Sequence, residues 1–161
     1  MDEAEKPATR LAPDIRDVEL FNPPELAPPV GFAHAAAAGE LVVLGGQVGS
    51  DASGRVVAPG DITAQFTQAI RNVATALRAA GSTPERTVKL TYFVTDLAAY
   101  RANLKPIGAA YREVFGHHYP ATSLFEVKGL FDPQAMVEIE CLALRVSSYP
   151  DSSARSKKGT S

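Results

Sequence analysis

The 161-residue chain contains no tryptophan and a single cysteine, Cys141. One cysteine cannot form an internal disulfide, and the first residues lack the charged and apolar pattern of a secretory signal peptide. Both observations favour a cytoplasmic protein. The length suits one domain with its own hydrophobic core and is short for two.

The sequence also lacks a long apolar run and an excess of basic residues. No stretch approaches the roughly 20 apolar residues of a membrane helix, so no membrane is expected as a partner. The formal charge of −2 and the pI of about 5.9 give no excess of the positive charge that binds phosphate backbones, so nucleic acid is not expected either. His117 and His118 have no further ligands at suitable spacing, and we expect neither a metal nor a cofactor.

The two ends differ in composition from the centre of the chain. Residues 1–29 mix charges with proline-rich stretches such as NPPELAPP, a pattern that holds neither a helix nor a central strand. Residues 147–161 are serine-rich and polar, with too little apolar surface to offset the entropy of ordering them. We therefore expect a flexible arm over 1–29, a domain over 30–146 and a disordered tail over 147–161.

Hydrophobic periodicity divides the central domain into strands and helices. Residues 32–47 predict a hairpin around Gly39, with its second strand closing on Gly45 and Gly46. Asp61 is placed to cap a helix that ends near Gly81. Strands are expected over 87–97, 122–128 and 136–145, and a second helix over 98–115, broken or kinked at Pro106.

This order of elements predicts an α+β fold with one sheet and two helices on one of its faces. In residues 87–97 we place Val88, Leu90, Tyr92 and Val94 on one face and Phe93 on the other. Both faces of the sheet carry apolar side chains, yet two helices cover only one of them. The uncovered face needs a partner if it is to leave water, so the sequence predicts an oligomer.

The last strand, AMVEIECLAL over residues 135–144, carries two acids in an aliphatic run. Alternation places Val137, Ile139 and Cys141 on the wholly apolar face and Glu138 and Glu140 on the opposite one. We assign the apolar face to the helices and the mixed face to a partner subunit. A buried carboxylate without a partner costs several kcal/mol, so each acid must be solvated, hydrogen-bonded or protonated there.

Five short motifs follow one another between about Gly31 and Arg145: a Gly-Gln after a hairpin strand, an Ala-Gln near a helix start, an Asn in that helix, a Pro-Ala-x-Ser turn and a Glu-Ile-Glu strand. In this order they resemble the RidA family (YjgF, L-PSP) of reactive-intermediate deaminases. The resemblance implies a chorismate-mutase-like fold and a homotrimer with three clefts between subunits. It also implies hydrolysis of imines and enamines to ketoacids and ammonia.

The chain departs from this family at three cleft positions. Where the family has an arginine that holds the substrate carboxylate, this chain has Thr122, whose neutral hydroxyl cannot replace a guanidinium fork. Phe32 stands at the position of a cleft tyrosine, and Gly45 at that of a serine. The glutamate that orients the hydrolytic water in the family is retained as Glu138.

The resemblance therefore implies Glu138 as the catalytic acid or base, and we expect a substrate-binding set formed by Phe32, His34, Gly45, Thr122 and Ser123, in which His34 is included for its position two residues after Phe32. For Glu138 the alternative is a solvated carboxylate or one that bridges subunits. His34 is either a proton shuttle or an ordinary hydrogen-bonded histidine. We expect Glu140 to pair with a basic group across the interface, with Lys128 and Arg145 as candidates.

We expect a RidA-like homotrimeric enzyme acting on an imine, enamine or related carbonyl intermediate by hydrolysis, deamination or tautomerisation. Because the arginine is missing, its substrate should lack the free α-carboxylate of the usual 2-imino acids. The alternatives are a non-catalytic trimer that binds a metabolite or a protein, and a cyclase or tailoring enzyme of a specialised biosynthetic pathway. The acidic pI disfavours the ribonuclease activity ascribed to some family members.

Overall fold

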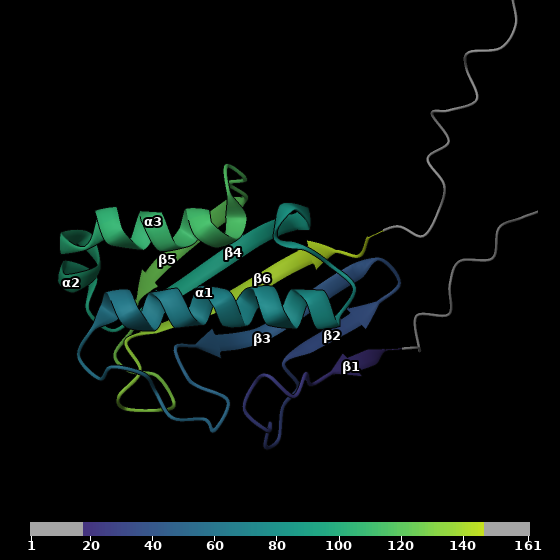
Figure 1. Ribbon diagram of the computed structural model, residues 1–161, viewed down its shortest axis with the longest axis horizontal. Helices are drawn as coiled ribbons and strands as arrows, with labels where there is room; N and C mark the ends of the chain where they lie inside the picture. The colour runs from purple at the N-terminus through teal and green to yellow at the C-terminus, as the bar shows by residue number, and fades with distance from the viewer. Residues whose placement is uncertain (1–17, 147–161) are drawn as a thin grey trace, which may run out of the picture.

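The computed structural model describes residues 18–146 and contains one six-stranded sheet with its helices on one side (Figure 1). The spatial order of the strands is β1-β2-β3-β6-β4-β5, in which β4 and β5 are parallel and the other neighbours antiparallel. The strands are β1 (Glu19–Phe21), β2 (Ala35–Ala38), β3 (Leu41–Val48), β4 (Thr87–Val94), β5 (Ala121–Glu126) and β6 (Val137–Leu144). This arrangement confirms the α+β class.

Helix α1 (Ile62–Ala79) forms as the sequence predicts. The side chain of Asp61 accepts a hydrogen bond from the backbone N–H of Ala64 at 3.0 Å, which satisfies one of the free donors of the first turn. The apolar positions at helical spacing are all buried against the sheet. Gly81 follows the helix with φ +74, a left-handed conformation that glycine adopts at low cost.

The second helical stretch breaks earlier than predicted. It forms α2 (Leu97–Ala102) and α3 (Leu104–Phe115), with the break at Asn103 and not at Pro106. Pro106 lies in the first turn of α3, where a missing backbone N–H removes no intrahelical hydrogen bond. The chain therefore restarts its helix before the proline, and Pro106 is accommodated without a kink.

Strand β4 contains an irregularity that the alternation pattern did not predict. Thr87 pairs with Ala143 and Lys89 with Leu142, so Val88 is an extra residue between two ladder positions. This bulge turns Val88 outward and buries Thr87 in its place. The assignment of Val88 to the covered face is therefore wrong, whereas Leu90, Tyr92 and Val94 lie there as predicted.

The prediction of a flexible arm over residues 1–29 is wrong for the last part of that range. β1 adds to the edge of the sheet beside β2, and Leu26 is buried in the core. The guanidinium of Arg145 holds the strand by donating to the Glu19 carboxylate at 2.7 Å and lying over the ring of Phe21. Arg145 is thus engaged within its own chain, and the pairing of Glu140 with Lys128 or Arg145 across an interface stays a prediction. Residues 1–17 and the tail expected over 147–161 lie outside the described residues.

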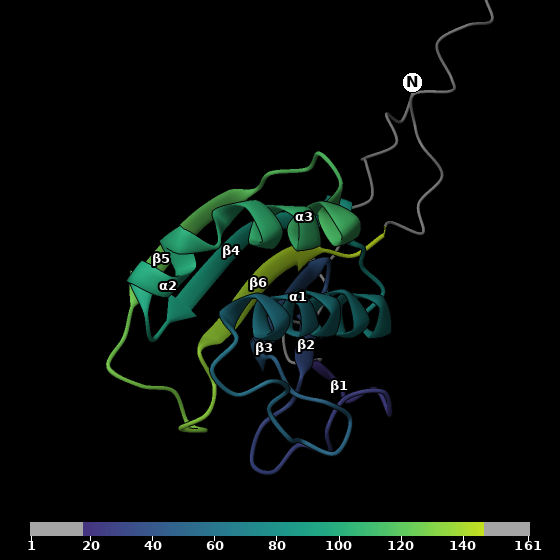
Figure 2. The ribbon, with the colours of Figure 1, turned by 60° about the vertical axis from the view of Figure 1, so that its left-hand side comes forward.

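The helices of the described residues pack on one face of the sheet, and none of these residues forms a helix over the other face (Figure 2). The core lies between α1, α3 and the covered sides of β3, β4 and β6. On β6, Val137, Ile139 and Cys141 are buried there, which confirms the predicted alternation. None of the described helices has the length and apolarity that crossing a membrane requires.

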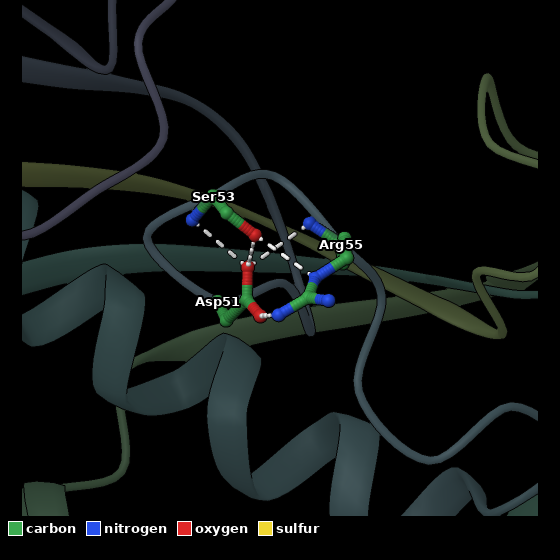
Figure 3. A network of polar contacts seen from close by, with 3 residues as sticks. All are labelled: Asp51, Ser53 and Arg55. Carbon is green, nitrogen blue, oxygen red and sulfur yellow. Dashed lines mark hydrogen bonds and ion pairs between the residues drawn. The ribbon is translucent and has the colours of Figure 1, made fainter.

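The loop from β3 to α1 is organised by a small polar network (Figure 3). One carboxylate oxygen of Asp51 accepts from the backbone N–H groups of Ser53 and Arg55 and from the Ser53 hydroxyl. The Arg55 guanidinium donates to that hydroxyl and faces the other Asp51 oxygen at 3.4 Å. Together with Gly54, which has φ +85, these contacts fix a tight turn and explain the cluster without a ligand.

Candidate active site

Glu138 lies on the open face of the sheet, in the central strand β6. It pairs with Val48 of β3 on one side and with Phe93 of β4 on the other. Phe93 in turn stacks on Phe125 of β5, with ring centroids 6.1 Å apart. The carboxylate therefore stands beside an aromatic pair on a face that no helix of residues 18–146 covers.

The surroundings of Glu138 disfavour its charged form. The side chain is half-buried, and burial raises its pKa above the ordinary glutamate value of 4.5, with a smaller contribution from the negative charge of Glu140. Among residues 18–146 neither a cation within 4 Å nor a hydrogen-bond donor pairs with its carboxylate. Every buried side-chain oxygen of the described residues has a hydrogen-bond partner. Since the Glu138 carboxylate has none, its oxygens are not fully buried, and water reaches them.

Gly46 makes room for the Glu138 side chain. A Cβ added at Gly46 would collide with the carboxyl group of Glu138 and stand 2.8 Å from its Cγ. Gly46 belongs to a bulge in β3 between Leu44 and Gln47, so the strand continues to Val48 and does not close on the glycines as predicted. The sequence shows the Gly-Gly pair, but its contact with Glu138 depends on the register of two distant strands.

Two polar side chains of α1 fix the backbone at the start of β6 and at the end of β3, the two segments that flank Glu138. The buried amide of Gln65 accepts from the Met136 N–H at 2.7 Å and donates to the Gln134 carbonyl at 3.0 Å, which fixes the entry into β6. Asn72 donates to the carbonyls of Val48 and Ser50, at the exit of β3. The Ala-Gln and Asn of the sequence motif therefore position the backbone around Glu138.

The segment around residues 32–34 packs against the same glycine pair. The N–H of Gly45 donates to the His34 carbonyl at 3.0 Å, and a Cβ at Gly45 would stand 2.8 Å from the Ala33 carbonyl oxygen. Phe32 is exposed and meets the His34 ring edge-on at 5.3 Å. Phe32 and His34 thus lie beside Gly45, the sequence neighbour of the glycine that faces Glu138.

His34 is a buried, hydrogen-bonded histidine. Its Nε2 donates to the Ala27 carbonyl at 2.7 Å, since that carbonyl only accepts, and Nδ1 then faces the Gln47 amide at 3.4 Å. Gln47 is itself anchored by donating to the Gly45 carbonyl at 2.9 Å. These contacts favour a positioning role for His34 over that of a proton shuttle.

Thr122 and Ser123 lie on the edge strand β5, and alternation sends their side chains to opposite faces. Ser123 shares the open face with Glu138 and accepts a hydrogen bond from the Lys89 ammonium at 2.6 Å. Thr122 lines a pocket on the helix side, and its hydroxyl donates to the Pro120 carbonyl at 2.9 Å. Within one chain, therefore, the structure does not bring Thr122 and Glu138 together.

Lys89 is a candidate site residue that no sequence pattern indicated. It shares a small surface pocket on the open face with Thr91 and Glu140. The bulge at Val88 places Lys89 on this face, and that irregularity has no clear sequence signal. Lys89 is thus a cation available close to Glu140 and Ser123, in the row of side chains next to Glu138.

The remaining candidate groups have structural roles. His118 contacts the Thr87 carbonyl through Nε2 at 2.8 Å. Cys141 is buried in the core, and burial raises the pKa of its thiol to about 11, which leaves it protonated and unreactive. Residues 18–146 contain no group of three or more His, Cys, Asp or Glu side chains that could hold a metal ion.

The fold and this site define a small α+β protein with an unpaired carboxylate on an open sheet face. A family model described as Endoribonuclease L-PSP matches residues 24–145. The RutC family protein UK114 of Drosophila melanogaster is 34% identical over 127 residues, 78% of this chain and 88% of the fly protein. The chain belongs to the YjgF/L-PSP family, which is the RidA family of the resemblance described above.

Other relatives agree with this membership. The 2-iminobutanoate/2-iminopropanoate deaminase of Salmonella typhimurium is 34% identical over 110 residues, 66% of this chain and 81% of the deaminase. The crystal structure of the YjgF gene product from E. coli superposes with a TM-score of 0.68 at 28% identity, covering 80% of this chain and 99% of that one. Sequence and fold therefore lead to the same family.

The contact between Gly46 and Glu138 makes a direct prediction. Gly46→Ala should lower the free energy of unfolding by about 0.5–1 kcal/mol, because the new methyl group makes the flexible end of the Glu138 side chain rotate away at a modest cost. Urea denaturation measures this change. In a Glu138→Ala background the same substitution should cost much less, since the side chain that it strikes is gone.

Gly129→Ala is the matched control, because nothing lies within 4 Å of a Cβ at that position. It should leave the unfolding free energy within about 0.5 kcal/mol of the wild type. An equal cost of Gly46→Ala with and without the Glu138 side chain would show that the two residues do not meet.

Proposed function

We propose that this protein is a RidA-like enzyme that acts on an imine, an enamine or a related carbonyl intermediate, with Glu138 as its general acid and base. The observation that carries the proposal is the state of Glu138: half-buried, unpaired within the described residues, raised in pKa and reached by water. A carboxyl group whose pKa moves toward neutrality exchanges protons more readily under cellular conditions.

One carboxyl group of this kind is sufficient for imine hydrolysis. In its ionised form Glu138 accepts a proton from a water molecule as that water attacks the carbon of the protonated imine, which gives a neutral carbinolamine. The resulting carboxylic acid then donates this proton to the nitrogen. As the C–N bond breaks and ammonia or an amine leaves, the carbinolamine hydroxyl gives its proton back to the Glu138 carboxylate and becomes the carbonyl group. An enamine would first take a proton at carbon from the same acid and so enter the reaction as the imine.

We further propose that the substrate lacks a free α-carboxylate. Relatives of this chain bear the name 2-iminobutanoate/2-iminopropanoate deaminase, and such imino acids carry a carboxylate. Where the family resemblance places an arginine for that group, Thr122 offers a neutral hydroxyl that is already bonded to the Pro120 carbonyl. Phe32 and Gly45 also replace polar groups, which favours a less acidic substrate.

The cleft that we propose lies between subunits of a homotrimer. Exposed apolar side chains from β1, β3, β4 and β6 gather on the open face, and a monomer would leave this surface in water: Leu20, Leu41, Val43, Val88, Leu142 and Leu144. Since Glu138 and Thr122 face opposite sides of one sheet, a shared cleft needs β5 from a neighbouring subunit. A trimer brings two chains together at each cleft.

The oligomer proposal is tested by the mass of the purified protein in solution. Multi-angle light scattering should give about three times the 17.0 kDa of one chain, near 51 kDa. A mass near 17 kDa at micromolar concentration would contradict the proposed intersubunit cleft.

Glu138→Gln should lower kcat by about 10²–10⁴-fold, because the amide neither accepts nor donates the proton that the reaction moves. The assay follows ammonia release from imines with and without an α-carboxylate, including 2-iminobutanoate. We expect the imines without the carboxylate to be the better substrates.

Glu113→Gln, on the exposed surface of α3, serves as the matched control and should retain wild-type kcat. Equal turnover by the Glu138→Gln protein would rule out the catalytic role of this residue. Saturable binding of these compounds without turnover would instead favour a non-catalytic metabolite-binding trimer.

A further inference from the structure

The open face of the sheet changes in character along the strands. At the end of β6 that is remote from Glu138, aliphatic residues pair across the strands, Leu41 with Leu144 and Val43 with Leu142. Leu144 lies six positions after Glu138 in β6, which at about 3.3 Å per residue of strand places it roughly 20 Å away. These aliphatic residues belong to the surface that we assign to subunit contact.

A polar row separates this aliphatic end from Glu138. Thr91 pairs with Glu140 on β6 and with Ser123 on β5, and the Lys89 ammonium donates to the Ser123 hydroxyl. Apolar contacts between proteins are commonly bounded by a polar rim of this kind. The aliphatic surface therefore ends before the row of side chains that contains Glu138.

The row of Glu138 carries aromatic side chains. Phe93 pairs with Glu138, and Phe125 on the edge strand β5 pairs with Phe93. The two ring planes are 24° apart, so the rings form one stacked surface, and Phe125 is 53% exposed. Because neighbouring strands lie about 4.8 Å apart, this surface extends from about 5 Å to about 10 Å to one side of the acid.

The aromatic surface is suited to an uncharged ring and not to a charged group. Val48 pairs with Glu138 on its other side, so the acid stands between apolar neighbours. A planar ring that lies on Phe93 and Phe125 gains stacking contacts and leaves water, whereas a charged group would lose its hydration there. A ring attached close to the atom on which Glu138 acts would reach this surface.

We infer that Phe93 and Phe125 determine the specificity of the site, and that the substrate carries an aromatic ring one or two bonds from the imine carbon. This inference rests on the proposed function of Glu138 and narrows it from uncharged imines and enamines in general to aryl-substituted ones. The rival role for the two rings is a further subunit contact, which would give no selectivity among substrates.

The test compares two imines without a carboxylate, released in situ by an amine oxidase from 2-phenylethylamine and from 2-cyclohexylethylamine. The two differ in one planar and one puckered ring of similar size. The full-length protein should hydrolyse the phenyl imine with a kcat/KM about fivefold higher, because only the planar ring stacks on the aromatic surface. Ammonia release above the spontaneous rate measures both reactions.

Phe125→Leu removes the exposed ring and keeps an apolar side chain. It should lower kcat/KM for the phenyl imine about fivefold and change that for the cyclohexyl imine less than about twofold, so that the preference disappears. Phe93→Leu should have the same effect and gives a second reading. Phe131→Leu is the matched control, a fully exposed phenylalanine between β5 and β6 that contacts no other ring of residues 18–146, and it should change neither value.

Equal kcat/KM for the two imines, or a preference that survives both Phe125→Leu and Phe93→Leu, would overturn the inference. Light scattering should give the Phe125→Leu protein the same mass as the wild type. A smaller mass together with an unchanged preference would assign the rings to subunit contact instead.

Binding without turnover separates this inference from the proposed function. The probe is 4-fluorophenylacetamide, a stable neutral compound whose carbonyl takes the place of the imine, followed by ¹⁹F NMR titration. It should bind saturably, about fivefold more weakly to Phe125→Leu, and still bind to Glu138→Gln. This pattern without any turnover by the wild type would contradict catalysis by Glu138 and support the aromatic specificity. Turnover that depends on Glu138 but shows no preference between the rings would contradict the inference alone.

Discussion

The placement of the Glu138 carboxyl group over Gly46 is the contact on which the account of this protein depends. A central strand of a sheet usually carries an apolar or fully paired side chain, and a carboxylate there is costly unless water or a donor reaches it. Here the absence of a Cβ at Gly46 leaves space for the acid, and the open sheet face leaves it accessible. The acid therefore stays half-buried and accessible to water, which is the state on which its proposed role in proton transfer rests.

Contacts on the covered face of the sheet, mainly with α1, fix the backbone around Glu138 and Gly46. The covered face of β6 buries its aliphatic residues under α1, and Gln65 ties the start of the strand to the same helix. Asn72 fixes the exit of β3, and the bulge before Gln47 brings Gly46 opposite the acid. A buried hydrogen-bonded side chain restricts the backbone more strongly than apolar packing alone, because its geometry is directional. The proposed chemistry of Glu138 thus rests on polar residues of a helix on the opposite face.

Periodicity was sufficient to predict the fold class, the capped helix α1 and the two faces of β6, because each depends on neighbours close in sequence. Periodicity failed at Val88, where a bulge changes the register of β4. It also failed at Glu19, where the short strand β1 pairs with β2 at the edge of the sheet. The same limit applies to the site. Glu138 was found through its motif, whereas its contact with Gly46 follows from strand pairing over about 90 residues of sequence, which no local pattern encodes.

The most direct measurement is the titration of the Glu138 carboxyl group in the assembled protein. ¹³C-labelling of glutamate side chains and comparison with the Glu138→Gln spectrum identify its carboxyl signal. If Glu138 is the working acid, its titration midpoint should lie clearly above 4.5, because burial and the nearby Glu140 both disfavour the charged form. A midpoint at or below 4.5 would show an ordinary or ion-paired carboxylate and would contradict its role as the working acid.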